Sequence, residues 1–175
     1  DWGEYVGSKI VKPLIDDINC SITVAKETKG KGANIRLSAG TKLMTDTLTP
    51  LRNLKSELSV SDSRYQIIAD KLGLTILQCG IDYYNDSNDD DAAFKAMKLQ
   101  KYAQSIVVGK MAKDRCDENV HILEGIISKL PPLEVMASHR AIQASLAAFA
   151  IEPDLISCSI QLIKDCAPHI VNIKE

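Results

Sequence analysis

Apolar residues recur at helical spacing along most of this chain. From residue 61 onward they fall three or four positions apart, which is the pattern of amphipathic α-helices. The clearest stripe comprises Tyr65, Ile68, Leu72, Ile76, Cys79 and Tyr83. A second apolar stripe on the same segment comprises Ile67, Leu74, Leu77, Ile81 and Tyr84. A helix with two apolar faces packs between neighbours, so we expect a central helix here, capped by Ser61 or Ser63.

The same spacing predicts further helices after the central one. They cover about 90–111, 113–130 and 133–150, and a last helix begins at Pro153 and is ended or kinked by Pro168. Short connections favour antiparallel neighbours, and no strand–helix–strand alternation appears. We therefore expect an all-α fold, either an antiparallel helical bundle or a short repeat-like stack of six to eight helices.

The first 60 residues carry a weaker helical pattern. Helices are expected over 3–18, 38–48 and 49–58. Residues 18–25 fit either a helix or an extended loop, and ETKGKGANIR, residues 27–36, predicts an exposed basic loop. The domain hypothesis is an N-terminal helical region, 1–60, and a helical core, 61–175, which can form one domain together.

Composition narrows the class of protein. Aromatic residues make up only 5% of the 175 residues, so an aliphatic core with close helix packing is expected. The net charge of −2 argues against a dedicated nucleic-acid binder. No apolar run is long enough to span a membrane. Five scattered cysteines are not a disulfide framework, which predicts a cytoplasmic protein.

An acidic cluster between Asn85 and Asp91 is the first candidate for chemistry. An EF-hand loop needs glycine at its sixth position and glutamate at its twelfth. Counted from Asp86, those positions hold Asp91 and Met97, so the cluster does not fit. We expect a turn instead, in which Asn88 or Asp89 caps the next helix.

Other catalytic and metal patterns are also missing from the sequence. No paired cysteine and histidine spacing typical of zinc sites occurs, and the glycines between Gly30 and Lys42 lack P-loop spacing. The sequence therefore predicts no catalytic residue, no metal ligand and no cofactor. The alternative is a helical-bundle enzyme or small-ligand-binding domain, with its site between helices near Cys116, His121 or His139.

Two helical segments carry a family resemblance. A bulky residue, a small one and a tyrosine follow each other at Ile76, Gly80 and Tyr83, and the next helix carries Ala96, Leu99 and Ala103. This hairpin, within residues 65–111, resembles the tetratricopeptide (TPR) type, although its turn is longer and the family's repeat does not recur. The resemblance implies TPR-like packing of a helix pair.

A fainter resemblance involves bacterial proteins associated with J-domains. Residues 69–87 and 95–106 resemble helical regions of uncharacterised bacterial proteins, some of which carry a J-domain elsewhere. The His-Pro-Asp motif of the J-domain is absent from this chain. The resemblance therefore implies an accessory, co-chaperone-like helical part of a larger protein.

These patterns favour a non-catalytic interaction or scaffold module that binds a protein or peptide, and they leave its oligomeric state open. Stacked helices present grooves for such partners. The candidate contact residues are Tyr84, Phe94 and Tyr102, unless these belong to the core. A further hypothesis is that the basic loop binds an anionic membrane or nucleic acid through Lys26, Lys29, Lys31 and Arg36.

Overall fold

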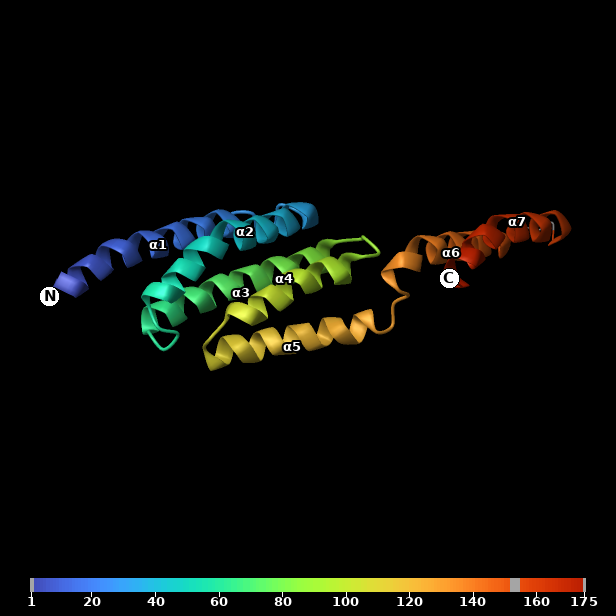
Figure 1. The fold of residues 1–175 in the computed structure, drawn as a ribbon. Coiled ribbons are helices and arrows are strands. Elements are labelled where there is room, and N and C mark those ends of the chain that lie inside the picture. The colour runs from blue at the N-terminus through green and yellow to red at the C-terminus, as the bar shows by residue number, and fades with distance from the viewer. Residues whose placement is uncertain (1, 152–154, 175) are drawn as a thin grey trace. The chain divides into compact units, whose positions relative to one another are not determined.

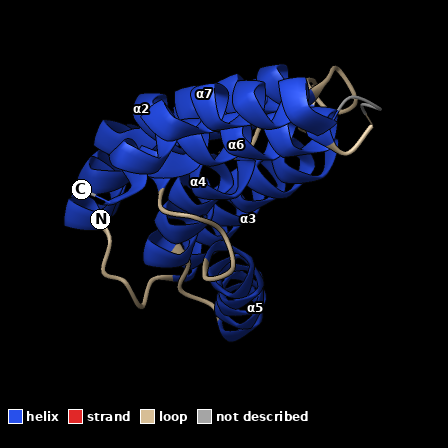
Figure 2. Ribbon diagram, turned by 90° about the vertical axis from the view of Figure 1, so that its right-hand side faces the viewer, coloured by secondary structure: helices blue, strands red, loops and turns tan. Residues whose placement is uncertain are grey.

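The chain is helical throughout the part that the structure describes. A computed structural model describes residues 2–151 and 155–174, with side chains for 9–151 and 159–173. These residues form α1 (Trp2–Lys26), α2 (Ala33–Glu57), α3 (Ser63–Asp86), α4 (Ala92–Ile106), α5 (Lys110–Ile127), the 3-10 helix η1 (Leu133–Val135), α6 (Met136–Phe149) and α7 (Leu155–Lys174). No strand occurs among them (Figure 2), and none of these helices is long and apolar enough to cross a membrane. The all-α prediction is confirmed.

The helices fall into two compact units, Asp1–Ser128 and Lys129–Glu175. In the first unit, α1 to α5 pack in order along the chain, and α3 contacts α1, α2, α4 and α5 (Figure 1). The predicted central helix is therefore α3. In the second unit, α6 and α7 pack against each other as a hairpin, and η1 contacts α6.

The two apolar stripes of α3 meet different environments. Every residue of the first stripe, from Tyr65 to Tyr83, is buried in the core. The second stripe is buried only in part. Leu77 is buried, whereas Ile67 is 69% exposed. At the start of α3, the Asp62 carboxylate accepts a hydrogen bond from the Arg64 backbone N–H at 2.8 Å. Asp62 is thus the N-cap, and the predicted serine caps are wrong.

The end of α4 differs from the end that the sequence pattern predicts, and a side chain from α3 explains the difference. We expected a helix to continue to Met111, but α4 ends at Ile106. The Asp70 carboxylate, on α3, accepts hydrogen bonds from the backbone N–H groups of Val108 at 2.7 Å and Gly109 at 3.0 Å. A β-carbon at Gly109 would collide with that carboxylate. The chain turns here because α3 supplies the partners for its free backbone groups.

Two prolines at which the sequence pattern predicts a helix boundary or a kink lie inside continuous helices. The segments 38–48 and 49–58 form the single helix α2, with Pro50 inside it, and α7 continues past Pro168. Proline removes one helix hydrogen bond, but Thr47, Leu51 and Leu54 on both sides of Pro50 are buried. Their packing holds α2 together across that position. Residues 18–25 are helical, as part of α1; the helix start expected at Pro153 lies outside the described residues.

The acidic segment forms the predicted turn, but it does not cap α4 with a side chain. Asp89 accepts hydrogen bonds from the Tyr83 hydroxyl at 3.1 Å and from Lys95 Nζ at 3.4 Å, and Asp91 pairs with Lys95 at 2.9 Å. The capping prediction for Asn88 or Asp89 is therefore wrong, because Asp89 is held by Tyr83 and Lys95. No group of three or more metal-ligating side chains comes together in the described residues.

Two glycines lie where helices of the first unit approach each other closely. A β-carbon at Gly80 would lie 3.3 Å from the Ala96 carbonyl oxygen on α4. A β-carbon at Gly40 on α2 would lie 2.8 Å from Leu99 Cδ1 and 2.9 Å from Cys79 Cβ. Small residues therefore let α2, α3 and α4 share one tight core.

Replacing Gly40 tests this packing. We expect Gly40→Ala to lower the free energy of unfolding by about 1–3 kcal/mol, because the core has no room for the added methyl group. Gly125→Ala on α5 is the matched control, since nothing lies within 4 Å of the added atom. The free energy of unfolding of the control should rise by up to about 1 kcal/mol, because alanine has a higher helix propensity than glycine. Urea unfolding measures both, and equal stabilisation of the two variants would contradict the packing.

Candidate functional site

The three aromatic candidates from the sequence are half-buried. Tyr102 packs against the core, where burial raises the pKa of its hydroxyl. Its oxygen has no hydrogen-bond partner in the described residues. Tyr84 and Phe94 are also only partly exposed, and none of the three lines a cavity described below. Their role as contact residues stays a prediction.

The basic segment divides into two different environments. Lys29 and Lys31 lie exposed in the turn between α1 and α2, as expected. The expectation of an exposed loop is wrong for Arg36, because α2 begins at Ala33 and the Arg36 residue is only 2% exposed. Its position matches the buried stripe of α2, which comprises Arg36, Gly40, Leu43, Thr47, Leu51 and Leu54. Extending the predicted helix backwards by one turn would have found it.

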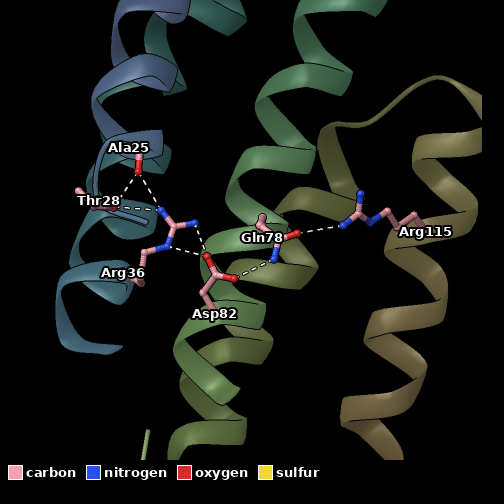
Figure 3. Close-up of polar contacts among 6 residues, drawn as sticks. All are labelled: Ala25, Thr28, Arg36, Gln78, Asp82 and Arg115. Carbon is pink, nitrogen blue, oxygen red and sulfur yellow. Dashed lines mark hydrogen bonds and ion pairs between the residues drawn. The ribbon is translucent and has the colours of Figure 1, made fainter. Parts of the chain in front are cut away.

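Arg36 is held by a dense set of hydrogen bonds (Figure 3). Its Nε and Nη2 atoms lie 2.8 and 2.7 Å from Oδ2 of Asp82 on α3. Its Nη1 atom donates to the Ala25 carbonyl oxygen at 2.8 Å and to the Thr28 hydroxyl at 2.9 Å. The guanidinium therefore joins the last turn of α1 to α2 and α3. These contacts offset the cost of burying the Arg36 charge.

The network continues through Asp82 toward α5. Gln78 Nε2 donates to the second Asp82 oxygen at 2.8 Å, and Arg115 Nη2 donates to Gln78 Oε1 at 2.9 Å (Figure 3). Both polar ends of Gln78 are thus used within the protein. Four segments, the end of α1 and helices α2, α3 and α5, are linked by these polar contacts.

An apolar groove of about 450 Å³ lies between α1 and α2. We refer to it as the α1/α2 groove; its lining residues are Cys20, Ser21, Val24, Ala25, Thr28, Asn34, Ile35, Ser38, Ala39, Lys42, Leu43 and Asp46. Val24 and Ile35 belong to its apolar floor and remain 53% and 47% exposed. An ion pair of 2.7 Å between Lys42 and Asp46 stands at its edge. The groove therefore combines an apolar floor with a polar rim of both charges.

A second cavity, of about 440 Å³, is lined largely by basic residues. We refer to it as the basic pocket; its lining residues are Lys26, Lys29, Arg36, Lys71, Leu74, Thr75 and Gln78. A third cavity, of about 410 Å³, belongs to the α6–α7 hairpin and is lined by Ala144, Ser145, Ala148, Phe149, Gln161, Leu162 and Asp165.

The residues named for the enzyme alternative line none of these three cavities. His121 and His139 are exposed. Cys116 is buried, and its burial raises the pKa of the thiol to about 11. Because the thiolate is the nucleophile, Cys116 is poorly suited to covalent catalysis at neutral pH. Sequence reasoning named Lys26, Lys29 and Arg36 as candidate anion contacts, and all three line the basic pocket. It missed Lys71 and the α1/α2 groove, because these residues come together only in the folded chain.

Removing the carboxylate of Asp82 tests the structural role of Arg36. We expect Asp82→Ala to lower the free energy of unfolding by about 3–5 kcal/mol, because it leaves a buried cation without its partner. Asp46→Ala removes the partner of the exposed Lys42, whose side chain is 69% accessible, and should cost less than about 1 kcal/mol. Urea unfolding compares the two, and a loss of similar size for both would show that the buried pair is not special.

Comparison with known proteins assigns no family to this geometry. No protein-family model, curated protein or solved structure matches the chain. The TPR-like and J-domain-associated resemblances therefore rest on the residues quoted for them and stay predictions.

Proposed function

We propose that the chain is a non-catalytic interaction module whose α1/α2 groove binds an amphipathic helix of a partner protein. The observation that carries this proposal is the apolar floor of the groove. Val24 and Ile35 face into it and are about half exposed. Ile35 lies beside the buried stripe of α2, so the core of the first unit does not need it. An occupant that covers these side chains would add apolar burial, worth about 1.5–3 kcal/mol for each fully buried aliphatic side chain.

A helix is the occupant that this groove fits best. The groove runs between two helices of 25 residues each, and helix pairs of this kind accept a third helix through residues spaced i, i+3, i+4 and i+7. α3 already packs on both α1 and α2 within the unit. The partner helix would pack on another face of the same pair.

The rim indicates the chemistry of the partner. Lys42 and Asp46 pair with each other, and Asn34 and Ser38 add neutral polar groups. A rim with no excess of either charge favours a partner helix of mixed polarity over a strongly acidic or basic one. Specificity would come from hydrogen bonds at the rim and from the fit of apolar side chains on the floor.

The resemblances to other helical proteins support the same type of function. TPR-like helix pairs present grooves, and an accessory domain of a larger, co-chaperone-like protein would recognise a protein partner. The cytoplasmic location expected from the five cysteines belongs to this proposal. Tyr84, Phe94 and Tyr102 are secondary candidates, because they line none of the three cavities.

Charge substitutions on the groove floor test the proposal. We expect Val24→Glu with Ile35→Glu to abolish capture of a specific partner from native extract, because a buried unpaired carboxylate opposes docking. The control is Ile67→Glu with Met111→Glu, which adds the same charge at exposed positions on α3 and α5 (Met111 is 88% exposed). Quantitative mass spectrometry of proteins retained by the wild type and both variants makes the comparison.

Two readouts decide whether the captured protein occupies the groove. Peptide scanning should map its binding to a segment with apolar residues at helical spacing. Binding should also protect the exposed thiol of Cys20, which lines the groove, from alkylation. Equal capture by all three proteins, or binding that leaves Cys20 fully reactive, would contradict this function. Light scattering tests whether the chain associates with itself. If the wild type and the control associate and only the groove variant does not, the groove binds a second copy of the chain instead.

A further inference from the structure

We infer that the basic pocket is a binding site for a small organic ligand that carries two phosphate groups. The pocket brings together three lysines from separate parts of the first unit. Lys26 comes from the last turn of α1, Lys29 from the following turn and Lys71 from α3. This site is distinct from the apolar α1/α2 groove and does not depend on the function proposed for it.

The charges of these lysines are not balanced within the protein. No carboxylate lines the pocket. Among the side chains that the structure describes, none of the three lysines forms an ion pair. Lys71 donates to the Asn19 side-chain oxygen, a neutral acceptor that fixes its position and leaves its charge. Three like charges around one cavity repel one another, and a bound anion would relieve that repulsion.

Arg36 positions segments of the pocket, although its own charge is paired with Asp82 and does not attract a ligand. Its positive charge is neutralised by Asp82 at 2.7 Å. It also donates to the carbonyl oxygen of Ala25, at the end of α1. Exposed carbonyl groups at a helix C-terminus repel anions, so this hydrogen bond removes an obstacle to anion binding. The bond from Arg36 to Thr28 holds the turn that carries Lys29. Arg36 is therefore a positioning residue.

The volume and charge of the pocket indicate the class of ligand. The cavity of about 440 Å³ has room for more than one phosphate group. A phosphate ester carries about −1.5 to −2 at pH 7. Two such groups about balance the positive charge of the three lysines, whereas one phosphate group leaves part of that positive charge unbalanced. The aliphatic side chain of Leu74 offers a surface for the organic part of the ligand.

Recognition in this pocket would depend on the lysines. Gln78 already donates to Asp82 and accepts from Arg115, and the Thr75 hydroxyl donates to the Lys71 carbonyl oxygen at 2.7 Å. The ammonium groups are then the main donors left to a ligand. Lysine acts as a flexible point charge and lacks the fixed fork of arginine, so the pocket should select for the number of phosphate groups more than for their geometry.

Calorimetry with inorganic pyrophosphate at low ionic strength tests the inference. We expect saturable binding of one pyrophosphate per chain, weakened by added salt and tighter than binding of orthophosphate. Lys29→Ala with Lys71→Ala should weaken it by about tenfold or more, because two charge-assisted contacts are lost. Lys55→Ala with Lys98→Ala is the matched control. It removes the same charge from exposed residues outside the pocket and should bind as the wild type does.

Several results would overturn the inference. Equal weakening in the two double variants would show diffuse attraction by the net charge. An absence of saturable binding, or equal affinity for orthophosphate, would exclude a site for two phosphates. No variant should unfold at a markedly lower temperature than the wild type, since each change lies at an exposed lysine.

Vesicles distinguish a soluble ligand from a lipid headgroup with the same chemistry. The comparison uses phosphatidylcholine vesicles with and without phosphatidylinositol bisphosphate. Headgroup-dependent binding that pyrophosphate displaces, and that Lys29→Ala with Lys71→Ala removes, would assign the phosphates to a lipid. Pyrophosphate binding without vesicle binding would assign them to a soluble molecule. Vesicle binding that pyrophosphate does not displace would contradict the site.

Discussion

The ion pair between Arg36 and Asp82 is the interaction on which the rest of the first unit depends. It places a charged guanidinium in a core that is otherwise mostly aliphatic, where a cation without a partner would be strongly destabilising. Through Ala25 and Thr28 the same guanidinium fixes the end of α1. Ala25 and Thr28 line the α1/α2 groove, while Arg36 itself lines the basic pocket. One buried pair therefore sets the geometry of two different candidate binding sites.

The sequence pattern predicted those parts of the fold that depend on burial along one helix. The stripe from Tyr65 to Tyr83 is long and regular, and all of it is buried. The pattern failed where contacts between helices decide the outcome. α4 stops at Ile106 because Asp70, far away in sequence, accepts the next backbone N–H groups. α2 continues through Pro50 because the residues on both sides of it are buried.

The candidate sites were harder to predict for a related reason. Arg36 looked like part of a solvated loop, since neighbouring lysines and glycines dominate the local composition. The partner that makes its burial possible, Asp82, lies 46 residues away. Lys71 joins Lys26 and Lys29 only because α3 packs against α1. The pattern along one helix does not show which residues of other helices it will contact. The complete sites are therefore visible only in the folded structure.

Hydrogen exchange of the backbone amides in Asp82→Asn would test most directly whether this pair organises both sites. The substitution keeps the shape of the side chain and removes its charge. Exchange should accelerate most in residues 24–36, where α1 ends and α2 begins, while the amides of α4 and the second half of α5 should lose only the protection that follows from the lower global stability. Unchanged exchange in residues 24–36, or the same acceleration in every helix of the first unit, would contradict the central role of the Arg36–Asp82 pair.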